Sequence, residues 1–300
     1  MNFLTNLKIK FKQWKYIAEE MDRLPESIEK IQEALGRIEN RQLRLINRND
    51  LKSNTFRVFS QWGEDGIIQF LLQNVKVPRN IFVEFGVQNY KESNTRFLLT
   101  SCNWSGLVID CNIDDIFYIK NDPIYWQYNL KALNAFITRD NINNLLVENG
   151  IKGDIGLLSI DIDGNDYWIW EAIDVVKPAI VIIEYNYRFG KDRAVTIPYQ
   201  EDFIRVRGHY SMIYYGASLK ALCILGGKKG YSFVGCNDGG DNAFFVRKDL
   251  KGAELKELSA EEGYVVGQFR EALDKKGRPL YLSFEEEKQI VLSLALSEVE

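Results

Sequence analysis

The sequence predicts an α/β fold in which helices cover both faces of a doubly wound, mostly parallel sheet. Two observations support this. Five short apolar runs occur at residues 81–85, 106–109, 133–137, 155–160 and 179–183. Amphipathic stretches at residues 66–72, 141–147 and 168–176 alternate with them. Runs that are apolar throughout fit strands buried on both sides, so strands and helices in alternation indicate a Rossmann-like sheet.

A third observation concerns the end of the sheet. Residues 231–235 and 242–246 are apolar, and a short segment rich in Asn, Asp and Gly joins them. This pattern is typical of a β-hairpin, so we expect an antiparallel final strand. Mixed sheets of this kind are common among doubly wound folds.

The chain divides into three segments of different character. Residues 1–50 contain a single Gly and are predicted to form an amphipathic helix with a candidate coiled coil. Residues 51–250 form the α/β domain. Residues 251–300 are charged and carry no chemical motif that we can find, so we expect a C-terminal helical appendage at the surface.

Part of the first segment has heptad spacing. The seam consists of Ile28, Ile31, Leu35, Ile38 and Leu45. Gln42 occupies one seam position, and Gly36 weakens the helix by about 1 kcal/mol relative to Ala. We expect either self-association through this short seam or packing of the helix on its own domain.

A second apolar stripe lies ahead of Pro25. It consists of Leu4, Leu7, Phe11, Trp14, Ala18 and Met21, and it is flanked by Lys8, Lys10, Lys12 and Lys15. A helix of this kind suits peripheral contact with an anionic membrane surface. The alternative is a helix that packs on the domain or on a partner.

Composition excludes several classes of protein. With 38 basic and 42 acidic residues the net charge is -4, which argues against a general nucleic-acid binder. Four cysteines without C-x-x-C spacing and a single histidine argue against a zinc site and indicate a reducing compartment. The sequence shows no signal-peptide core and no bilayer-spanning stretch. We expect a cytoplasmic protein, peripheral at the inner face of the membrane if the stripe binds lipid.

Ligands of doubly wound folds bind at the carboxyl ends of the strands, so the residues there form the candidate site. The first strand ends near Glu84, and Gly86 permits a tight turn after it. A helix predicted to begin near Asn94 would aim its amides at that turn. The second strand ends at Asp110, whose carboxylate can accept hydrogen bonds from the ribose of an adenosine. The alternative role for Asp110 is a helix N-cap.

The turn after the first strand lacks the glycines of a dinucleotide site. Gln88 and Tyr90 stand where further glycines of G-x-G-x-x-G would be, and no Walker pattern is present. A pyrophosphate needs bare backbone, whereas S-adenosylmethionine carries no phosphate. The pattern therefore favours S-adenosylmethionine as the cofactor.

Carboxylates gather at the end of the fourth strand. Asp161, Asp163 and Asp166 lie close together there, and Glu184 and Asn186 end the next strand. Because the ends of adjacent parallel strands meet, Asp161, Asp163, Glu184 and Asn186 are plausible oxygen ligands for Mg²⁺ or another divalent cation. The alternative is a turn that is rich in Asp, Gly and Asn for its geometry alone.

Six blocks of the sequence resemble FkbM-like methyltransferases across residues 56–250. They are FSQWGEDG at 59–66, EFG with SNT at 84–86 and 93–95, WSGLVID at 104–110, SIDIDGNDY at 159–167, IEYN at 183–186 and NAFFVR at 242–247. The resemblance implies a class I S-adenosylmethionine-dependent O-methyltransferase that acts on a sugar or polyketide hydroxyl. It also implies a cofactor pocket lined by Glu84, Gly86, Asp110 and Asp161, with Asn94 nearby and with Thr138 and Asn141 beside the adenine.

The run DGNDY at residues 163–167 also resembles the Asp-Gly-Asp-x-Tyr metal site of antibiotic-sugar O-methyltransferases. There the first Asp binds Mg²⁺ and the next acts as base, but Asn165 replaces that second Asp here. We therefore expect Asp163 and Glu184, with Asn186, to hold the ion and Asp166 or His209 to act as base. By analogy, the acceptor is a sugar or glycan of a surface polysaccharide.

Two other functions stay open at this point. The pattern Asp161-x-Asp163 is also the D-x-D of a metal-dependent glycosyltransferase that uses a nucleotide sugar. The other alternative is a non-catalytic scaffold organised by the N-terminal helices.

Overall fold

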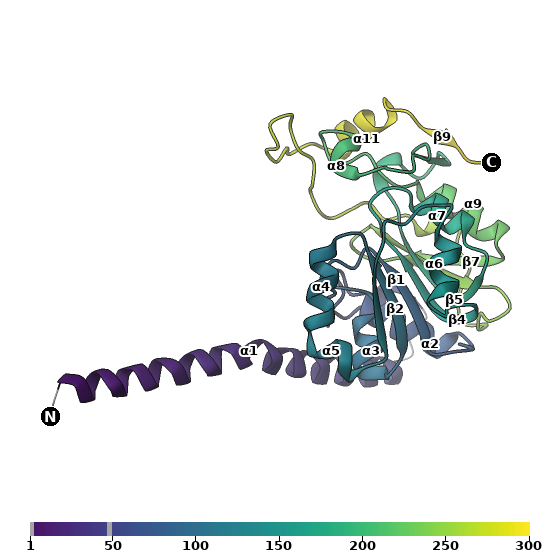
Figure 1. Ribbon diagram of the computed structural model, residues 1–300. Helices are drawn as coiled ribbons and strands as arrows, with labels where there is room; N and C mark the ends of the chain where they lie inside the picture. The colour runs from purple at the N-terminus through teal and green to yellow at the C-terminus, as the bar shows by residue number, and fades with distance from the viewer. Residues whose placement is uncertain (1–2, 47–49) are drawn as a thin grey trace.

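The computed structural model describes residues 3–46 and 50–300. Within these ranges it describes every side chain except those of residues 3–9, 19, 22 and 46. Its first element is α1 (Phe3–Ile46), a single helix that continues through Pro25. The N-terminal part of α1 projects from the rest of the molecule as a rod (Figure 1). Leu4, Leu7 and Lys8 of the predicted stripe lie outside the described side chains. No helix in the described part of the chain is long and apolar enough to cross a bilayer.

The core is a seven-stranded sheet in the order β3-β2-β1-β4-β5-β8-β7. Its strands are β1 (Ile81–Phe85), β2 (Ser105–Asp110), β3 (Leu130–Asn134), β4 (Gly153–Ile160), β5 (Val176–Glu184), β7 (Tyr231–Cys236) and β8 (Asn242–Arg247). The first five are parallel, and β8 lies antiparallel between β5 and β7. This confirms the predicted Rossmann-like sheet with an antiparallel final strand. The hairpin is inserted so that β7, not β8, is the edge.

Helices cover both faces of the sheet because successive residues of each strand point to opposite sides. One face packs on α2 (Glu64–Asn74), α3 (Arg96–Cys102), α4 (Ile113–Asn121) and α5 (Pro123–Gln127). The other packs on α6 (Ile142–Glu148), α7 (Asp166–Ala172) and α9 (Leu219–Lys228). In β1, for example, Phe82 is buried on the first face and Val83 on the second.

The third strand begins and ends three residues earlier than predicted. β3 pairs with β2 from Leu130, opposite Gly106, to Asn134, opposite Asp110. The next three residues, Ala135 to Ile137, are apolar like a strand but run beyond the end of β2. Ala135 still donates its N–H to the carbonyl of Asp110 at 3.0 Å, and all three residues line a cavity.

Residues 251–300 are less helical than predicted. Their helices are α10 (Ala260–Gly263) and α11 (Phe284–Leu292), and β9 (Ser297–Glu298) pairs with β6 (Val195–Thr196). Together with β6, η2 (Tyr187–Phe189) and α8 (Arg205–Gly208), α11 and β9 form a lobe above the sheet (Figure 1). By contrast, α10 packs on β7 and α9 beside the sheet. A separate apolar cluster that includes Phe189, Ile213 and Val291 holds the lobe together. A short 3₁₀ turn, η1 (Lys52–Asn54), precedes α2.

Candidate active site

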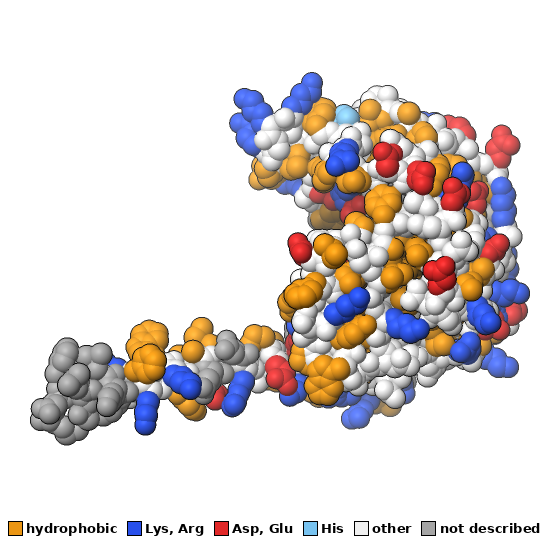
Figure 2. All heavy atoms as spheres, in the orientation of Figure 1, with side chains coloured by type: hydrophobic (Ala, Val, Ile, Leu, Met, Phe, Trp, Pro, Cys, Tyr) orange, Lys and Arg blue, Asp and Glu red, His pale blue; other side chains and the backbone are white. Residues whose placement is uncertain are grey.

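A cavity of about 380 Å³ opens at the carboxyl ends of β1, β2, β3 and β4. The strand order reverses between β1 and β4, so we call it the switch-point cavity. Figure 2 shows the molecule hollowed on the side where the lobe meets the domain. The lining residues are Gly86, Gln88, Ile109, Asp110, Cys111, Asn112, Asp115, Ala135, Phe136, Ile137, Asp161, Ile162, Asp163, Asn165 and Phe203.

Gly86 sets the close approach between the turns that follow β1 and β4. Its φ is 71°, and a Cβ at this position would lie 1.6 Å from the carbonyl oxygen of Asp161. Its N–H donates to the carbonyl of Ile109 at 3.0 Å, which ties the turn to β2. Only glycine fits both the conformation and the space.

Asp110 lines the cavity and is only 8% exposed. Its carboxylate accepts the N–H of Gln88 at 2.7 Å and the N–H of Asn112 at 2.8 Å, one on each oxygen. The N-cap of α4 is Asn112, whose side chain accepts the N–H of Asp114 at 3.0 Å. Asp110 is therefore not the N-cap, and each of its oxygens keeps a lone pair for a further donor.

Glu84 and Asn94 brace the loop before α3. The Glu84 carboxylate accepts the N–H of Asn94 at 2.8 Å and the N–H and hydroxyl of Thr95. Burial raises the pKa of Glu84 to about 7. The Asn94 amide donates to the Ser159 hydroxyl at 3.1 Å. Neither residue is among those that line the switch-point cavity in the described chain.

Thr138 and Asn141 shape the turn into α6. The N–H of Thr138 donates to the Asn141 side chain at 2.8 Å, and the N–H of Asn141 donates to the Thr138 hydroxyl at 3.2 Å. The cavity wall is built instead by the three residues just before them, 135–137. Thr138 and Asn141, which the resemblance implies beside an adenine, are thus not among the residues that line the cavity.

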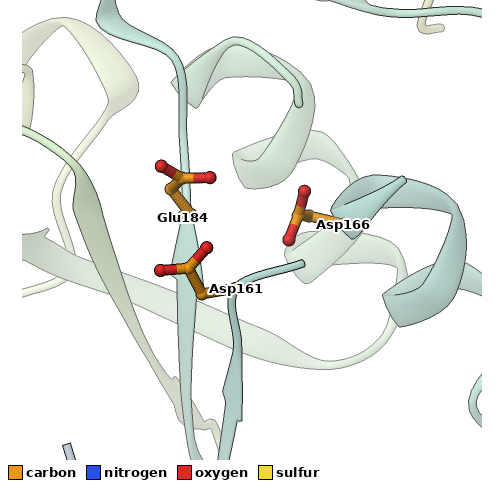
Figure 3. A group of neighbouring side chains, drawn as sticks. All are labelled: Asp161, Asp166 and Glu184. Carbon is orange, nitrogen blue, oxygen red and sulfur yellow. The ribbon is translucent and has the colours of Figure 1, made fainter. Parts of the chain in front are cut away.

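Three carboxylates meet beside the cavity, and we call Asp161, Asp166 and Glu184 the carboxylate trio. Oxygens of the three lie within 4.8 Å of one another. Asp161 follows β4, Glu184 is the last residue of β5, and Asp166 begins α7, and the three side chains share one space (Figure 3). Asp161 also lines the switch-point cavity, so the trio and the cavity are continuous.

Burial and mutual repulsion disfavour the charged forms of the carboxylate trio. Burial, followed by the charges of neighbouring carboxylates, raises the pKa of Asp161 and of Glu184 well above the ordinary range. Burial also raises the pKa of Asp166 to about 6, although its oxygens accept the N–H groups of Ile162 and Gly164 at 2.8 and 2.9 Å. Glu184 Oε2 is buried with no hydrogen-bond partner in the described structure. A proton, a cation or a hydrogen-bond donor of a bound molecule would compensate such a group.

This trio differs from the predicted metal ligands Asp163, Glu184 and Asn186. The Asn186 amide donates to the carbonyls of Ile213 and Tyr215 at 2.9 and 3.1 Å, so Asn186 braces the lobe. Asp163, with a φ of 56°, pairs with Arg205 at 2.5 Å. The structure therefore groups Glu184 with Asp161 and Asp166, whose oxygens lie within 4.8 Å of one another, and not with Asp163 or Asn186.

The candidate bases are placed very differently. Asp166 is fully buried and is held by backbone amides. His209 bonds the Ser211 hydroxyl at 2.6 Å and packs on Tyr210, and it is not among the described cavity-lining residues. Burial and nearby Lys275 lower the pKa of His209. Of the three predicted catalytic residues, Asp163 alone lines the cavity.

Sequence reasoning missed a charged network above the site. Arg205 pairs with both Asp163 and Glu271 and lies 3.9 Å from the Tyr215 ring centroid. Arg188 is fully buried and bonds Glu271 at 2.8 Å and Glu287 at 2.7 Å. The two glutamates come from residues 251–300, where no motif marks them. The last segment thus supplies the counter-charges that hold the lobe.

No protein-family model matches the sequence, and no curated protein matches it. Among solved structures, the chain is similar to an S-adenosylmethionine-dependent methyltransferase from Clostridium acetobutylicum, with 11% identity, a TM-score of 0.40, and 63% of this chain and 91% of that chain covered. It is also similar to the N-terminal domain of EvdMO1 with SAH bound, with 10% identity, a TM-score of 0.38, and 55% and 72% covered. A third is an O-methyltransferase from Bacillus cereus in complex with SAH, with 13% identity, a TM-score of 0.36, and 56% and 72% covered. Similarity this low carries no inference about chemistry, which rests on the site itself.

Proposed function

We propose that the protein is an S-adenosylmethionine-dependent O-methyltransferase that acts on a hydroxyl of a sugar or glycan. The observation that supports this most is the switch-point cavity, where Asp110 and Asp161 face one space between the β1 turn and the β4 turn. A ligand site at this place is the rule for doubly wound sheets. The resemblance to FkbM-like methyltransferases supports the same reaction and supplies the sugar as acceptor class.

The cavity suits an adenosyl group without phosphates. Gln88 and Tyr90 carry side chains at positions where a pyrophosphate site needs the bare backbone of glycine. Both adopt positive φ angles, of 47° and 62°. Asp110 has lone pairs free for ribose hydroxyls, and the wall at residues 135–137 offers an apolar surface for a purine. S-adenosylmethionine supplies an electrophilic methyl group on a sulfonium.

The carboxylate trio suits a divalent cation. Three hard oxygen donors converge, and the orphaned Glu184 oxygen lacks any other partner in the described structure. A cation held there would lower the pKa of a bound hydroxyl. We assign Asp161, Asp166 and Glu184 as the ligands, in place of the set predicted from sequence.

The remaining task is to orient the acceptor hydroxyl and remove its proton. Asp163 is half-exposed, lines the cavity and is held by Arg205, so we assign it as the proton acceptor. Arg205 is positioned in turn by Glu271. The lobe thereby covers the edge of the site where an acceptor would enter.

The geometry favours this reaction over the two alternatives. In a D-x-D metal site both carboxylates serve one ion, but here Asp161 belongs to the trio while Asp163 pairs with Arg205. A scaffold that has lost catalysis would not need a buried, unbalanced carboxylate group that costs stability.

The test is calorimetric titration of S-adenosylhomocysteine into the full chain, its Asp110→Asn variant and an Asp114→Asn control. Asn keeps the volume of Asp110 but loses the charge, so we expect binding to weaken by about 10- to 100-fold. Asp114 is an exposed neighbour at the start of α4 and should bind like the wild type. UDP-sugars titrated in parallel should give no heat. Binding of a UDP-sugar without S-adenosylhomocysteine would replace the methyltransferase by the glycosyltransferase, and no binding of either would favour the scaffold.

A further inference from the structure

The N-terminal helix α1 presents a long apolar seam that the domain does not cover. In heptad notation with Trp14 at an a position, the a and d residues from 14 to 45 are Trp14, Ile17, Met21, Leu24, Ile28, Ile31, Leu35, Ile38, Gln42 and Leu45. Every apolar member of this set is between 48% and 85% exposed. The seam is therefore longer than the stretch from residue 28 evident from sequence, because it continues through the helix on both sides of Pro25.

The domain packs on the opposite side of the same helix. Its contacts include Glu29, Gly36, Asn40 and Leu43, which occupy b and f positions, and Arg37, which occupies the adjoining c position and donates to the Ser101 hydroxyl at 3.4 Å. Gly36 sits against Val58 and Phe97. Leu43 packs on the same apolar cluster.

Polar contacts fix the same face of α1 to the domain. Glu29 pairs with Lys91 at 2.9 Å and with Arg96 at 3.1 Å. Asn40 donates to the Gln69 side chain at 2.8 Å. Since b and f lie opposite a and d, the docked domain leaves the whole seam open to a partner.

We propose that α1 pairs with α1 of a second copy of this chain as a parallel, in-register coiled coil along the seam from Trp14 to Leu45. Nearly five heptads exceed the three or four that a stable coiled coil needs. The flanking e and g positions are mostly polar or small, including Glu20, Ser27, Gln32 and Glu39, so the apolar stripe is narrow. A stripe confined to a and d is the geometry of a coiled-coil seam.

Gln42 argues for the parallel register. In a parallel pair it meets Gln42 of the second copy, so the two amides can bond each other. In an antiparallel pair centred on the seam it would face an apolar residue near position 17, which would leave a buried amide unpaired. The seam also includes Trp14 and Met21 of the stripe that the sequence assigned to a membrane surface, so the two uses compete for the same side chains.

Sedimentation of the full chain measures this directly. We expect a dimer of the 34.8 kDa chain, and we expect Ile31→Gln with Leu35→Gln to weaken dimerisation by about 100-fold or more, since each copy loses two buried apolar side chains. The control is Tyr16→Gln with Lys30→Gln, which places the same helix-forming residue at two exposed c positions and should leave the dimer intact. A wild-type monomer at tens of micromolar, or equal effects of the two double variants, would overturn the proposal. A monomer that co-sediments with phosphatidylserine vesicles would assign the helix to a membrane surface instead.

Register is tested by oxidation of Ile38→Cys in a Cys111→Ser background, with Lys30→Cys as control. In the parallel pair the two introduced thiols face each other, so a disulfide-linked dimer should form only for Ile38→Cys. An antiparallel pair would place the two Cα atoms about 25 Å apart at 1.5 Å per residue. Failure of Ile38→Cys to crosslink would therefore overturn the parallel arrangement.

Discussion

The two halves of the candidate site surround their buried carboxylates with different partners. At the ends of β1 and β2, the carboxylates of Glu84 and Asp110 are buried, and backbone amides bond both oxygens of each. At the ends of β4 and β5, Asp161 and Glu184 face each other, and one oxygen of Glu184 has no partner in the described structure.

The difference shows which carboxylates shape the protein and which require a further partner. A buried carboxylate with a complete set of donors fixes loop geometry, as Glu84 does for the chain before α3. A buried carboxylate among like charges raises the pKa of its neighbours until a proton or a cation joins it. Burial alone does not separate the two roles, and neither do the backbone donors, since both oxygens of Asp166 also accept amides. What distinguishes the trio is that its carboxylates lie within 4.8 Å of one another.

The largest effect should come from the contact that joins the two halves. We expect Gly86→Ala to destabilise the fold by about 4 kcal/mol or more and to abolish S-adenosylhomocysteine binding, because its Cβ would meet the Asp161 carbonyl. Gly153→Ala is the control, since Gly153 also has a positive φ of 69° but has no described atom within 4 Å of an added Cβ. It should lose only about 1 kcal/mol. Urea unfolding of both variants measures the difference, and similar losses would show that the contact is unimportant.

A matched pair of substitutions, one in each half of the candidate site, tests whether the two halves have different roles. We expect Glu184→Gln to weaken Mn²⁺ binding by about 100-fold, because a ligand charge is lost. We expect Glu84→Gln to leave Mn²⁺ affinity unchanged and to destabilise the fold by about 1–3 kcal/mol, because an amide NH₂ would face bonded donors. Equilibrium dialysis and thermal unfolding check the two effects. Equal losses of Mn²⁺ affinity in the two variants would contradict the comparison.

The metal-free protein should become less stable as pH rises. Burial raises the pKa of Asp166 to about 6, so this carboxyl binds its proton more tightly in the folded chain than in the unfolded chain. Its contribution to stability therefore falls as pH rises towards and through 6, by about 1–2 kcal/mol between pH 5 and pH 8. Glu184 and Asp161, whose pKa values are also raised, act in the same direction. We expect Mg²⁺ or Mn²⁺ to raise the melting temperature more at pH 8 than at pH 5, and an equal rise at both would exclude the trio as the cation site.

The smallest effect should come from the single histidine. His209 lies outside the lining of the switch-point cavity, so His209→Ala should change methyl transfer by less than about twofold and stability by less than about 0.5 kcal/mol. Asp163→Asn should slow transfer far more while S-adenosylhomocysteine still binds. If His209→Ala slowed methyl transfer more than Asp163→Asn did, His209 would be the base, as one of the two sequence predictions has it.

The sequence predicted the sheet well because its strands are buried on both faces and apolar throughout. The family resemblance implied a pocket lined by Glu84, Gly86, Asp110 and Asp161, and the cavity is lined by the last three but not by Glu84. The sequence named Asp163 as the partner of Glu184 and Asp166 as a candidate base, whereas the structure places Asp166 beside Glu184. That placement depends on the positive φ of Asp163 and on Arg205, which is 42 positions away in the chain.

The errors elsewhere have a similar cause. Residues 251–300 are charged in a way that suits helices, yet Glu271 and Glu287 are used as partners for the buried Arg188. Such pairings connect segments about 80 to 100 positions apart and leave no periodic pattern. In α1 the heptad pattern was visible, but which face the domain would occupy was not.

The most direct test of the central claim is a crystal structure of the full chain grown with S-adenosylhomocysteine and Mn²⁺, with data collected at the manganese edge. We expect the adenosyl group in the switch-point cavity with its ribose at Asp110, and one anomalous peak among Asp161, Asp166 and Glu184. A ligand bound elsewhere, or a manganese peak away from these three carboxylates, would contradict the account.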